Sequence, residues 1–437
     1  MRYVIIGGSA AAISAIESIR SIDDRGRIDL FTDEDTPLFS RVLLPYYVAE
    51  ELGKQLLNFR PLTFFEDKEV NAHLGVKVTE IIPGNKTIKA SDGKTYEYDR
   101  LLLATGGNPI VPPIPGFNKK GISTLKTMAD AENVYKMKGK KAVVIGAGSI
   151  GVESCISLRH RGMEVTLLEQ LGTVMPTVFD AEAASIIQKK IESFGINVVC
   201  GDRAEEFLGN DHVTAVRTSS REIPCDMVLV GIGIKPNIDL VKNIGVAIGE
   251  LGGVVVDESM KTSVQDIYAA GDVCETYDIA LDKKAINAIW PCAMEQGKVA
   301  GFNMVDKEAK YKGSLRMNSI GNFIGQPAIS IGLIHVPSNA SGAESGEDYQ
   351  EVIRKTKDTY RKLILKNGKI KGAILVGDTQ KSGIFSVLIK KQANVGEFTP
   401  ILLSHGLSFM DIIPLVRRQA DIFIEPEFKE LMDTHIV

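Results

Sequence analysis

The sequence has few of the residues that bind metals or form disulfides. None of its cysteines and histidines are spaced as in a zinc or iron–sulfur site, and the number of cysteines is odd. The six histidines are dispersed along the chain. We therefore expect no metal site, and reduced, mostly buried thiols in a cytoplasmic protein. The five cysteines are Cys155, Cys200, Cys225, Cys274 and Cys292.

The chain also lacks a strong net charge and a long apolar run. Its 51 basic and 55 acidic residues leave a net charge of −4, too small to predict binding to nucleic acid or to a membrane surface. The longest uncharged stretch, 101–118, is interrupted by glycine and proline, so we expect no membrane insertion. With 437 residues, of which 44% are hydrophobic, the chain is long enough for about three globular domains.

A glycine-rich turn follows an apolar strand expected over 142–145. Gly146, Gly148 and Gly151 have the GxGxxG spacing, and a helical pattern comes next. The first glycine permits a tight turn, the second lets the backbone approach a pyrophosphate, and the third lets the helix pack close to the strand. The N-terminus of that helix supplies N–H groups for phosphates. This order of strand, turn and helix predicts a dinucleotide site.

An acidic residue follows the next expected strand, over 164–168. Glu169 stands where such folds place a carboxylate that binds a ribose diol. A carboxylate there repels a 2′-phosphate, and no arginine occurs in the next ten residues. The sequence therefore predicts a preference for NADH over NADPH.

The N-terminus contains a less regular copy of the same pattern. The three glycine positions hold Gly7, Ser9 and Ala12, and the acidic residues Asp33 and Glu34 follow a strand expected over 28–31. Alanine still allows close helix packing, while Ser9 adds a hydroxyl. A secretory signal peptide would also explain the apolar N-terminus, but it leaves the matching acidic pair unexplained. We therefore predict a second nucleotide-binding unit.

Three further apolar stretches end in glycine turns. The first ends at Thr105-Gly106 and leads into a proline-rich passage expected to be a domain crossover, the second is 225–237, and the third ends at Gly271-Asp272. Ligands of doubly wound sheets lie at the carboxyl ends of the strands, so these turns mark the rims of two clefts. A helix is expected to start at Asp272, whose carboxylate either caps that helix or accepts a ligand hydroxyl.

The pattern changes from about residue 312. Alternating residues around Asn367-Gly368 predict a β-hairpin within 360–378, and a helix is expected over 384–392. The composition of 338–348 is typical of a surface loop. The last forty residues look partly helical.

The twin openings, followed in order by "ATGGNP", "GIGIKPN" and "IYAAGDV", resemble the FAD-dependent pyridine-nucleotide oxidoreductases over nearly the whole chain. The resemblance implies an α/β fold with two Rossmann-like domains of the glutathione-reductase type and an α+β C-terminal domain. The FAD-binding domain would comprise 1–107 and 240–310, the NADH-binding domain 108–239, and the interface domain 311–437. It also implies a homodimer or a subunit of a larger complex.

The resemblance further implies roles for individual residues. Glu153 would lie near the nicotinamide, Trp290 beside the isoalloxazine, and Arg41 along the FAD. The remaining FAD residues would be Gly7, Ser9, Ala12, Asp33 or Glu34, Thr105, Gly106, Gly271 and Asp272. The remaining NADH residues would be Gly146, Gly148, Gly151, Glu169, Gly231 and Gly233.

The passage "SRVLLPYYVAE" distinguishes between subfamilies. Aligning its Leu-Pro-Tyr-Tyr on that of the coenzyme A-disulfide reductases places Val42 where their cysteine stands, and no cysteine precedes Cys155. The passage instead resembles NADH:rubredoxin oxidoreductases and the flavoprotein part of NADH-dependent nitrite reductases. The expected function is therefore NADH:acceptor oxidoreduction through FAD, with electrons passing to a redox protein or an iron–sulfur partner subunit. Two alternatives stay open, namely a coenzyme A-disulfide reductase or NADH oxidase that has lost its cysteine, and an NADH-sensing regulatory flavoprotein.

Overall fold

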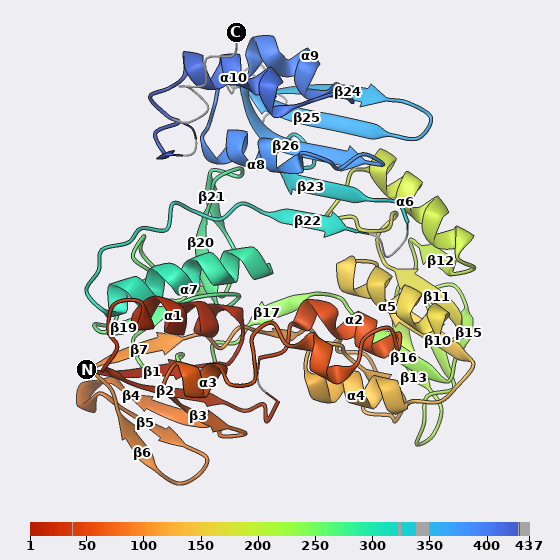
Figure 1. The fold of residues 1–437 in the computed structure, drawn as a ribbon. Helices are drawn as coiled ribbons and strands as arrows, with labels where there is room; N and C mark the ends of the chain where they lie inside the picture. Colours follow the sequence, from red (N-terminus) through yellow and green to blue (C-terminus); the bar gives the residue numbers. More distant parts are fainter. Residues whose placement is uncertain (37, 322–324, 338–348, 427, 429–437) are drawn as a thin grey trace. The chain divides into compact units, whose positions relative to one another are not determined.

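The computed structural model describes the chain except for residues 37, 322–324, 338–348, 427 and 429–437. The chain forms two compact units, which are described separately (Figure 1). Unit 1 comprises Met1–Gln170, Phe194–Tyr277 and Lys284–Ser314, and unit 2 comprises Leu171–Ser193, Asp278–Lys283 and Leu315–Val437.

The N-terminal pattern of unit 1 forms a five-stranded parallel sheet in the order β19-β7-β1-β2-β3. Hydrophobic side chains on both faces of the sheet are buried, as expected of a parallel sheet covered by helices. The helix α1 (Ala10–Arg20) connects the first two strands. The strands are β1 (Arg2–Ile6), β2 (Arg27–Thr32), β3 (Val70–Leu74), β7 (Arg100–Leu103) and β19 (Ile267–Ala269).

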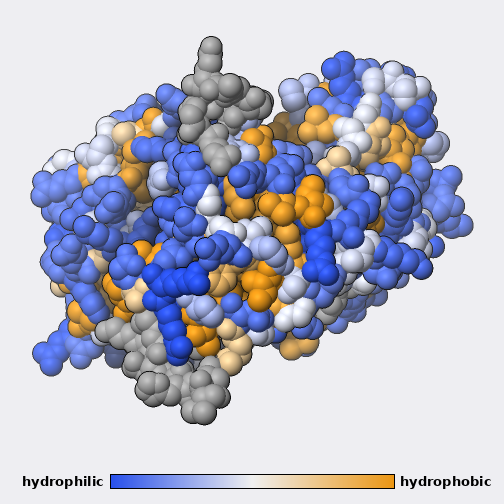
Figure 2. Space-filling model, turned by 90° about the horizontal axis from the view of Figure 1, so that it is seen from above, coloured by the Kyte–Doolittle hydropathy of each residue, from blue (hydrophilic) through white to orange (hydrophobic). Residues whose placement is uncertain are grey.

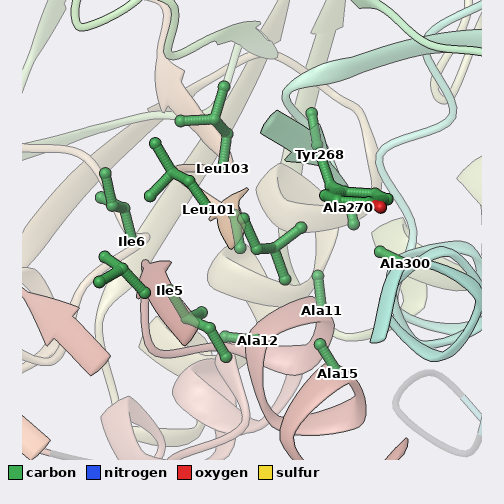
Figure 3. Close-up of a cluster of buried hydrophobic side chains, with 14 of the residues drawn as sticks. Ile5, Ile6, Ala11, Ala12, Ala15, Leu101, Leu103, Tyr268, Ala270 and Ala300 are labelled. Atoms are coloured by element: carbon green, nitrogen blue, oxygen red, sulfur yellow. The ribbon is translucent and has the colours of Figure 1, made fainter. Parts of the chain in front are cut away.

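Small residues let α1 pack against the helix α7 (Trp290–Met304), beside which it runs in Figure 1. A Cβ at Gly297 would lie 2.1 Å from the carbonyl oxygen of Ala11, and one at Gly301 would lie 2.5 Å from that of Ala15. Figure 3 shows the alanines of α1 next to the aliphatic side chains of β1 and β7, with Ala300 on the other side. Small residues on both helices therefore allow this close approach.

A second five-stranded parallel sheet in unit 1 repeats the plan in the order β12-β11-β10-β16-β9. Its first βαβ element is β10 (Lys141–Ile145), α5 (Ser149–His160) and β11 (Glu164–Glu169). In both sheets the strand before the glycine turn lies at the centre. The other strands are β9 (Ile122–Ser123), β12 (Asn197–Cys200) and β16 (Met227–Val230).

The proline-rich passage contributes a short ribbon to unit 1. Strand β8 (Gly107–Pro109) pairs antiparallel with β17 (Ile234–Pro236), so the segments after β7 and β16 run side by side. Two antiparallel sheets, β4-β5-β6 and β13-β14-β15, complete the β structure around the parallel sheets. Their strands are β4 (Val78–Ile82), β5 (Thr87–Ala90), β6 (Thr95–Glu97), β13 (Ala204–Leu208), β14 (Ala215–Thr218) and β15 (Glu222–Pro224).

The remaining elements of unit 1 are short. Strand β18 (Val254–Val255) pairs parallel with β20 (Cys274–Asp278), and β21 (Lys283–Ala285) follows along the chain. The helical elements are η1 (Arg41–Leu43), α2 (Leu44–Val48), η2 (Lys54–Leu57), α3 (Phe64–Asp67), η3 (Pro83–Asn85) and α4 (Met128–Lys136).

Unit 2 is built on an antiparallel sheet in the order β22-β23-β26-β25-β24. The predicted hairpin is confirmed, since Asn367 and Gly368 have φ of 51° and 74° and join β25 to β26. Helices pack on the apolar face of the sheet, among them the predicted one, which spans Ser382–Lys390. The elements are β22 (Met317–Ile320), β23 (Ala328–Gly332), β24 (Tyr349–Lys355), β25 (Tyr360–Lys366), β26 (Lys369–Val376), α8 (Ser382–Lys390), η6 (Gly396–Phe398), α9 (Thr399–Leu402) and α10 (Phe409–Arg418).

The segment Leu171–Ser193, which includes α6 (Ala181–Ser193), also belongs to unit 2. The Tyr360 hydroxyl donates a hydrogen bond of 2.6 Å to Asp180, and Lys355 pairs with Glu182. The loop predicted over 338–348 lies outside the described residues.

The face seen in Figure 2 carries mostly hydrophilic residues, with hydrophobic residues in groups among them. Within the described ranges, no helix is both long enough and apolar enough to cross a membrane.

Candidate functional site

The second glycine turn brings three backbone segments close together. Gly146 has φ of 95°, and a Cβ there would lie 2.5 Å from the carbonyl oxygen of Gly231, at the end of β16. A Cβ at Gly151 would lie 1.8 Å from the oxygen of Gly146. Around Gly148, by contrast, there is no atom within 4 Å of a Cβ position. Two of the glycines are therefore required by packing, while the middle one leaves open space in front of the N-terminus of α5.

Glu169 is the last residue of β11, and its carboxylate lies next to this turn. The oxygen Oε2 accepts a hydrogen bond of 2.8 Å from the amide of Ala147, and the residue is only 8% exposed. The carboxylate is thus held at the rim of the open space, where a ribose diol would meet it.

The N-terminal glycine turn has the same geometry at its first position. Gly7 has φ of 117°, and a Cβ there would lie 2.1 Å from the oxygen of Ala104, at the end of β7. Ser9 is the N-cap of α1, but its hydroxyl makes no capping bond, and Ala12 is fully buried. Ser9 lines a pocket together with Glu34 and Arg41.

The carboxylate of Glu34 fits a ligand with hydroxyl groups. Its oxygen Oε1 pairs with Arg41, whereas the buried Oε2 has no hydrogen-bond partner among the described residues. A buried acceptor without a partner costs about 1–3 kcal/mol, which a ligand hydroxyl at this pocket would recover. The neighbouring Asp33 is exposed, so of the two predicted acids Glu34 lies in the pocket.

The expectation that a helix starts at Asp272 is wrong. Gly271 and Asp272 form a turn, with φ of 88° at the glycine, and strand β20 starts two residues later because it pairs with β18. Burial raises the pKa of Asp272, and the charges of Lys126 and Arg41 partly counteract this rise. Asp272 therefore belongs to a buried group of opposite charges, not to a helix cap.

Sequence reasoning missed Lys126 and Gln296. Lys126 follows β9, its carbonyl oxygen accepts a hydrogen bond of 2.8 Å from Arg41, and burial lowers its pKa. Gln296 of α7 accepts a hydrogen bond of 2.8 Å from the amide of Gly271. No motif marks either residue, because segments distant in sequence bring them to the site.

The glycine turns after β7 and β16 are joined by the β8/β17 ribbon. The hydroxyl of Thr105 donates a bond of 2.8 Å to the oxygen of Asn237, whose amide donates one of 2.8 Å to Gly106. The oxygen of Gly233 accepts a bond of 2.9 Å from Ile110. These bonds tie together two of the predicted cleft rims.

Glu153, on α5, is a carboxyl whose pKa is strongly raised. Burial raises its pKa to about 7. Its charge in turn contributes to a raised pKa of Tyr46 on α2, after burial as the main cause. The two helices are connected by a hydrogen bond of 2.8 Å from the Ser157 hydroxyl to the oxygen of Pro45. Glu153 therefore lies where α5 packs against α2.

Val42 and Trp290 lie on elements next to the first sheet. Val42 is in η1 and is 49% exposed. Trp290 begins α7 and packs edge-on to Phe59, with ring centroids 4.9 Å apart. Burial raises the pKa of Cys225 to about 12, and it also raises that of Cys155 and Cys274. These three thiols are therefore unreactive at neutral pH.

Comparison with known proteins agrees with this geometry. Residues 1–297 match the model of the pyridine nucleotide-disulphide oxidoreductase family, and residues 320–393 match that of the rubredoxin NAD+ reductase C-terminal domain. The chain belongs to the pyridine nucleotide-disulphide oxidoreductase family. Members are NADH-dependent oxidoreductases, and their cofactors are FAD and NADH.

Three relatives cover nearly the whole chain. The NADH oxidase of Methanocaldococcus jannaschii is 30% identical over 450 residues, 99% of each chain. The epsilon subunit of NADH-dependent phenylglyoxylate dehydrogenase from Aromatoleum evansii is 30% identical over 404 residues, 90% of this chain and 92% of that protein. The structure of an NAD-dependent persulfide reductase from A. fulgidus has a TM-score of 0.86 at 31% identity, covering 96% of this chain and 84% of that one.

Proposed function

We propose that this chain oxidises NADH and passes the electrons, through FAD, to a separate redox protein or to an iron–sulfur partner subunit. The observation that carries the proposal is Val42, which aligns with the single cysteine of the coenzyme A-disulfide reductases when the Leu-Pro-Tyr-Tyr motifs are matched. The buried Cys155, Cys225 and Cys274 offer no substitute. The match of 320–393 to a rubredoxin reductase domain and the similarity to a dehydrogenase subunit support a protein acceptor.

The second glycine turn would bind NADH. In this proposal the N–H groups around Gly148 and at the start of α5 hold the pyrophosphate, and Glu169 accepts hydrogen bonds from a ribose diol. Gly231 and Gly233 would close over the nicotinamide end, and Glu153 would lie near it. Because a carboxylate repels a 2′-phosphate, NADH would be preferred to NADPH.

The first glycine turn would bind FAD. Gly7, Ser9 and Ala12 would line the pyrophosphate, and the unpartnered oxygen of Glu34 would accept a ribose hydroxyl. Arg41 and Lys126 would offset the phosphate charge, Asp272 would meet the ribityl chain, and Thr105-Gly106 and Trp290 would lie at the flavin. Bound FAD would supply the chemistry of accepting a hydride from NADH and donating single electrons to an acceptor.

Hydride transfer from NADH to FAD would require little acid or base catalysis from the residues of this chain. Hydride transfer depends mainly on proximity and orientation, which the two glycine turns and the β8/β17 ribbon would provide. With a pKa of about 7, Glu153 carries a proton on a large share of molecules at neutral pH. A neutral carboxyl there would place no full negative charge beside the nicotinamide.

A coenzyme A-disulfide reductase or NADH oxidase that has lost its cysteine is the competing enzyme, favoured by the similarity to the NADH oxidase and to the persulfide reductase. An NADH-sensing regulatory flavoprotein is the alternative of another class. Steady-state NADH oxidation with a viologen, with oxygen and with coenzyme A disulfide separates the three. Fast turnover with the viologen alone supports the proposal, faster turnover with the disulfide or oxygen supports the rival enzyme, and a single reduction without turnover supports the sensor.

Alkylation tests whether a thiol takes part. Treating the native FAD-loaded protein with iodoacetamide should leave NADH:viologen turnover within about twofold, because no thiol takes part in the proposed reaction and the buried Cys155, Cys225 and Cys274, whose pKa is raised, react slowly. Retained FAD absorbance and an unchanged unfolding temperature serve as controls. A large loss of turnover with both controls intact would contradict the proposal.

The domain bounds, 1–107 with 240–310, 108–239 and 311–437, stay a proposal. The pairing of β19 with β7 supports the discontinuous first domain. We also infer a cytoplasmic protein, since buried thiols suit a reducing compartment, and a homodimer or a subunit of a larger complex.

A further inference from the structure

A cavity of about 160 Å³ is lined by residues of unit 2, none of which is assigned to FAD or NADH. It is bounded by the strands β22 and β23, by the segment after β20 and by the segment that precedes α6. Its polar lining consists of Thr177, Asp278, Arg316, Asn318, Ser330 and His335.

Strand alternation explains why polar groups gather there. Ile329 and Ile331 of β23 point into the apolar core of unit 2, so Ser330 and Gly332 point to the opposite face. Asn318 pairs in register with Ser330, and the carbonyl of Arg316 accepts a hydrogen bond of 2.9 Å from Gly332. Side chains two residues apart share a face, so Arg316, Asn318 and Ser330 lie side by side.

Arg316 has no partner for its guanidinium. Among the described residues it makes neither a side-chain hydrogen bond nor an ion pair within 4.0 Å. Burial lowers its pKa, while the charge of Asp278 acts in the opposite direction. The oxygen Oδ1 of Asp278 instead accepts hydrogen bonds of 2.9 Å from the amides of Ala280 and Leu281. Arg316 therefore lines the cavity with N–H donors that are not hydrogen-bonded to Asp278.

The other polar groups on the wall are also available. Asn318, Ser330, Thr177 and His335 make no side-chain hydrogen bond within the described part of the chain, although Ser330 is only 2% exposed. At the edge, Lys362 donates to the oxygen of Ile334 at 3.4 Å and is held by acids 3.2 and 2.7 Å away. Because these groups line the cavity and have no protein partner, a ligand that accepts hydrogen bonds can reach them there.

We propose that this cavity binds a small oxyanion, phosphate or carboxylate, through the guanidinium of Arg316. Arginine offers a planar pair of donors that matches two oxygens of such a group. Asn318 and Ser330, on the same face, supply neutral donors to the remaining oxygens. Ligand sites for drug-sized molecules measure about 300–1,000 Å³, so this cavity is too small for a nucleotide and suits a small anion.

Equilibrium dialysis of the FAD-loaded full chain against radiolabelled inorganic phosphate, and separately against labelled malonate, tests the proposal. Arg316→Gln should weaken binding of the preferred anion at least tenfold, and Ser330→Ala should weaken it several-fold. Arg354→Gln is the matched control, because Arg354 is an exposed arginine of β24 in the same unit. Phosphate that binds at the nucleotide turns should bind equally to Arg316→Gln. The anion bound in the cavity is therefore measured as the difference in binding between the wild type and Arg316→Gln.

A measurement on the wild-type protein covers the case in which Arg316→Gln fails to fold. Phenylglyoxal modifies accessible arginines, and mass spectrometry reports each site. Saturating anion should slow modification of Arg316 and leave that of Arg354 unchanged. A phosphate-only or a malonate-only response identifies the class of anion. Equal binding by wild type and a folded Arg316→Gln variant, or no protection of Arg316 by either anion, overturns the proposal.

Discussion

Gly148 and Gly151 stand three residues apart, yet substitution by alanine should change different properties of the protein at the two positions. A Cβ at Gly151 would meet the oxygen of Gly146 at 1.8 Å, whereas ordinary contacts begin at 3.4 Å, so the turn must open. A Cβ at Gly148 meets nothing within 4 Å, and its φ of −74° and ψ of −176° suit alanine. The first change should therefore damage the fold, and the second should damage the binding of NADH.

The magnitudes follow from these contacts. Overpacking costs about 1–3 kcal/mol, and alanine in a helix recovers at most about 1 kcal/mol, so Gly151→Ala should destabilise by about 2 kcal/mol. At Gly148, the loss of about 0.5 kcal/mol from a poorer N-cap is offset by the lower entropy of the unfolded chain. A methyl group in the path of the pyrophosphate should raise the Kd for NADH at least about tenfold, or 1.4 kcal/mol.

Thermal unfolding and NADH titration of the FAD-loaded proteins measure the two effects. Gly151→Ala should lower the unfolding temperature by roughly 2–4 °C, at about 1–2 °C per kcal/mol for a chain of this length. Gly148→Ala should keep wild-type stability and FAD content. Gly84→Ala, at an open turn of unit 1, is the control for alanine substitution as such. Unchanged NADH affinity in Gly148→Ala would refute the proposed nucleotide site, and wild-type stability of Gly151→Ala would refute the close approach.

Three further outcomes are expected. Glu169→Ala should narrow the ratio of kcat/KM for NADH over NADPH by removing repulsion of the 2′-phosphate, and equal or better use of NADPH by the wild type would contradict the assignment. Because burial raises the pKa of Glu153 to about 7, the folded chain holds a proton there that the unfolded chain has lost above about 4.5. The free energy of unfolding should thus fall by up to roughly 3 kcal/mol as pH rises from 4.5 to 7. Urea titrations at pH 5 and 8 should show this fall in the wild type and not in Glu153→Gln. The same pH dependence in both proteins would contradict the raised pKa of Glu153. Fluorescence of Trp290, the only tryptophan, should rise when FAD is removed, and unchanged emission together with full activity of Trp290→Ala would make it purely structural.

Short-range features were predictable from the sequence. Both strand-turn-helix openings, the hairpin at Asn367-Gly368 and the helix near residues 384–392 depend on contacts between neighbours, so their patterns indicate them directly. The family and its cofactors followed from the order of such motifs. The absence of a thiol at position 42 could also be predicted without a structure, because the sequence itself shows valine there and valine cannot form a thiolate.

Features that depend on distant pairing were decided only by the tertiary structure. Asp272 was expected to start a helix, but the segment after it pairs with β18, over fifteen residues upstream, and becomes a strand. Of the adjacent acids Asp33 and Glu34, the path of the chain after β2 buries one beside Arg41 and exposes the other. Local composition determines which turns and helices can form, whereas the choice among strand partners, and with it the group that each charge meets, is a property of the whole folded chain.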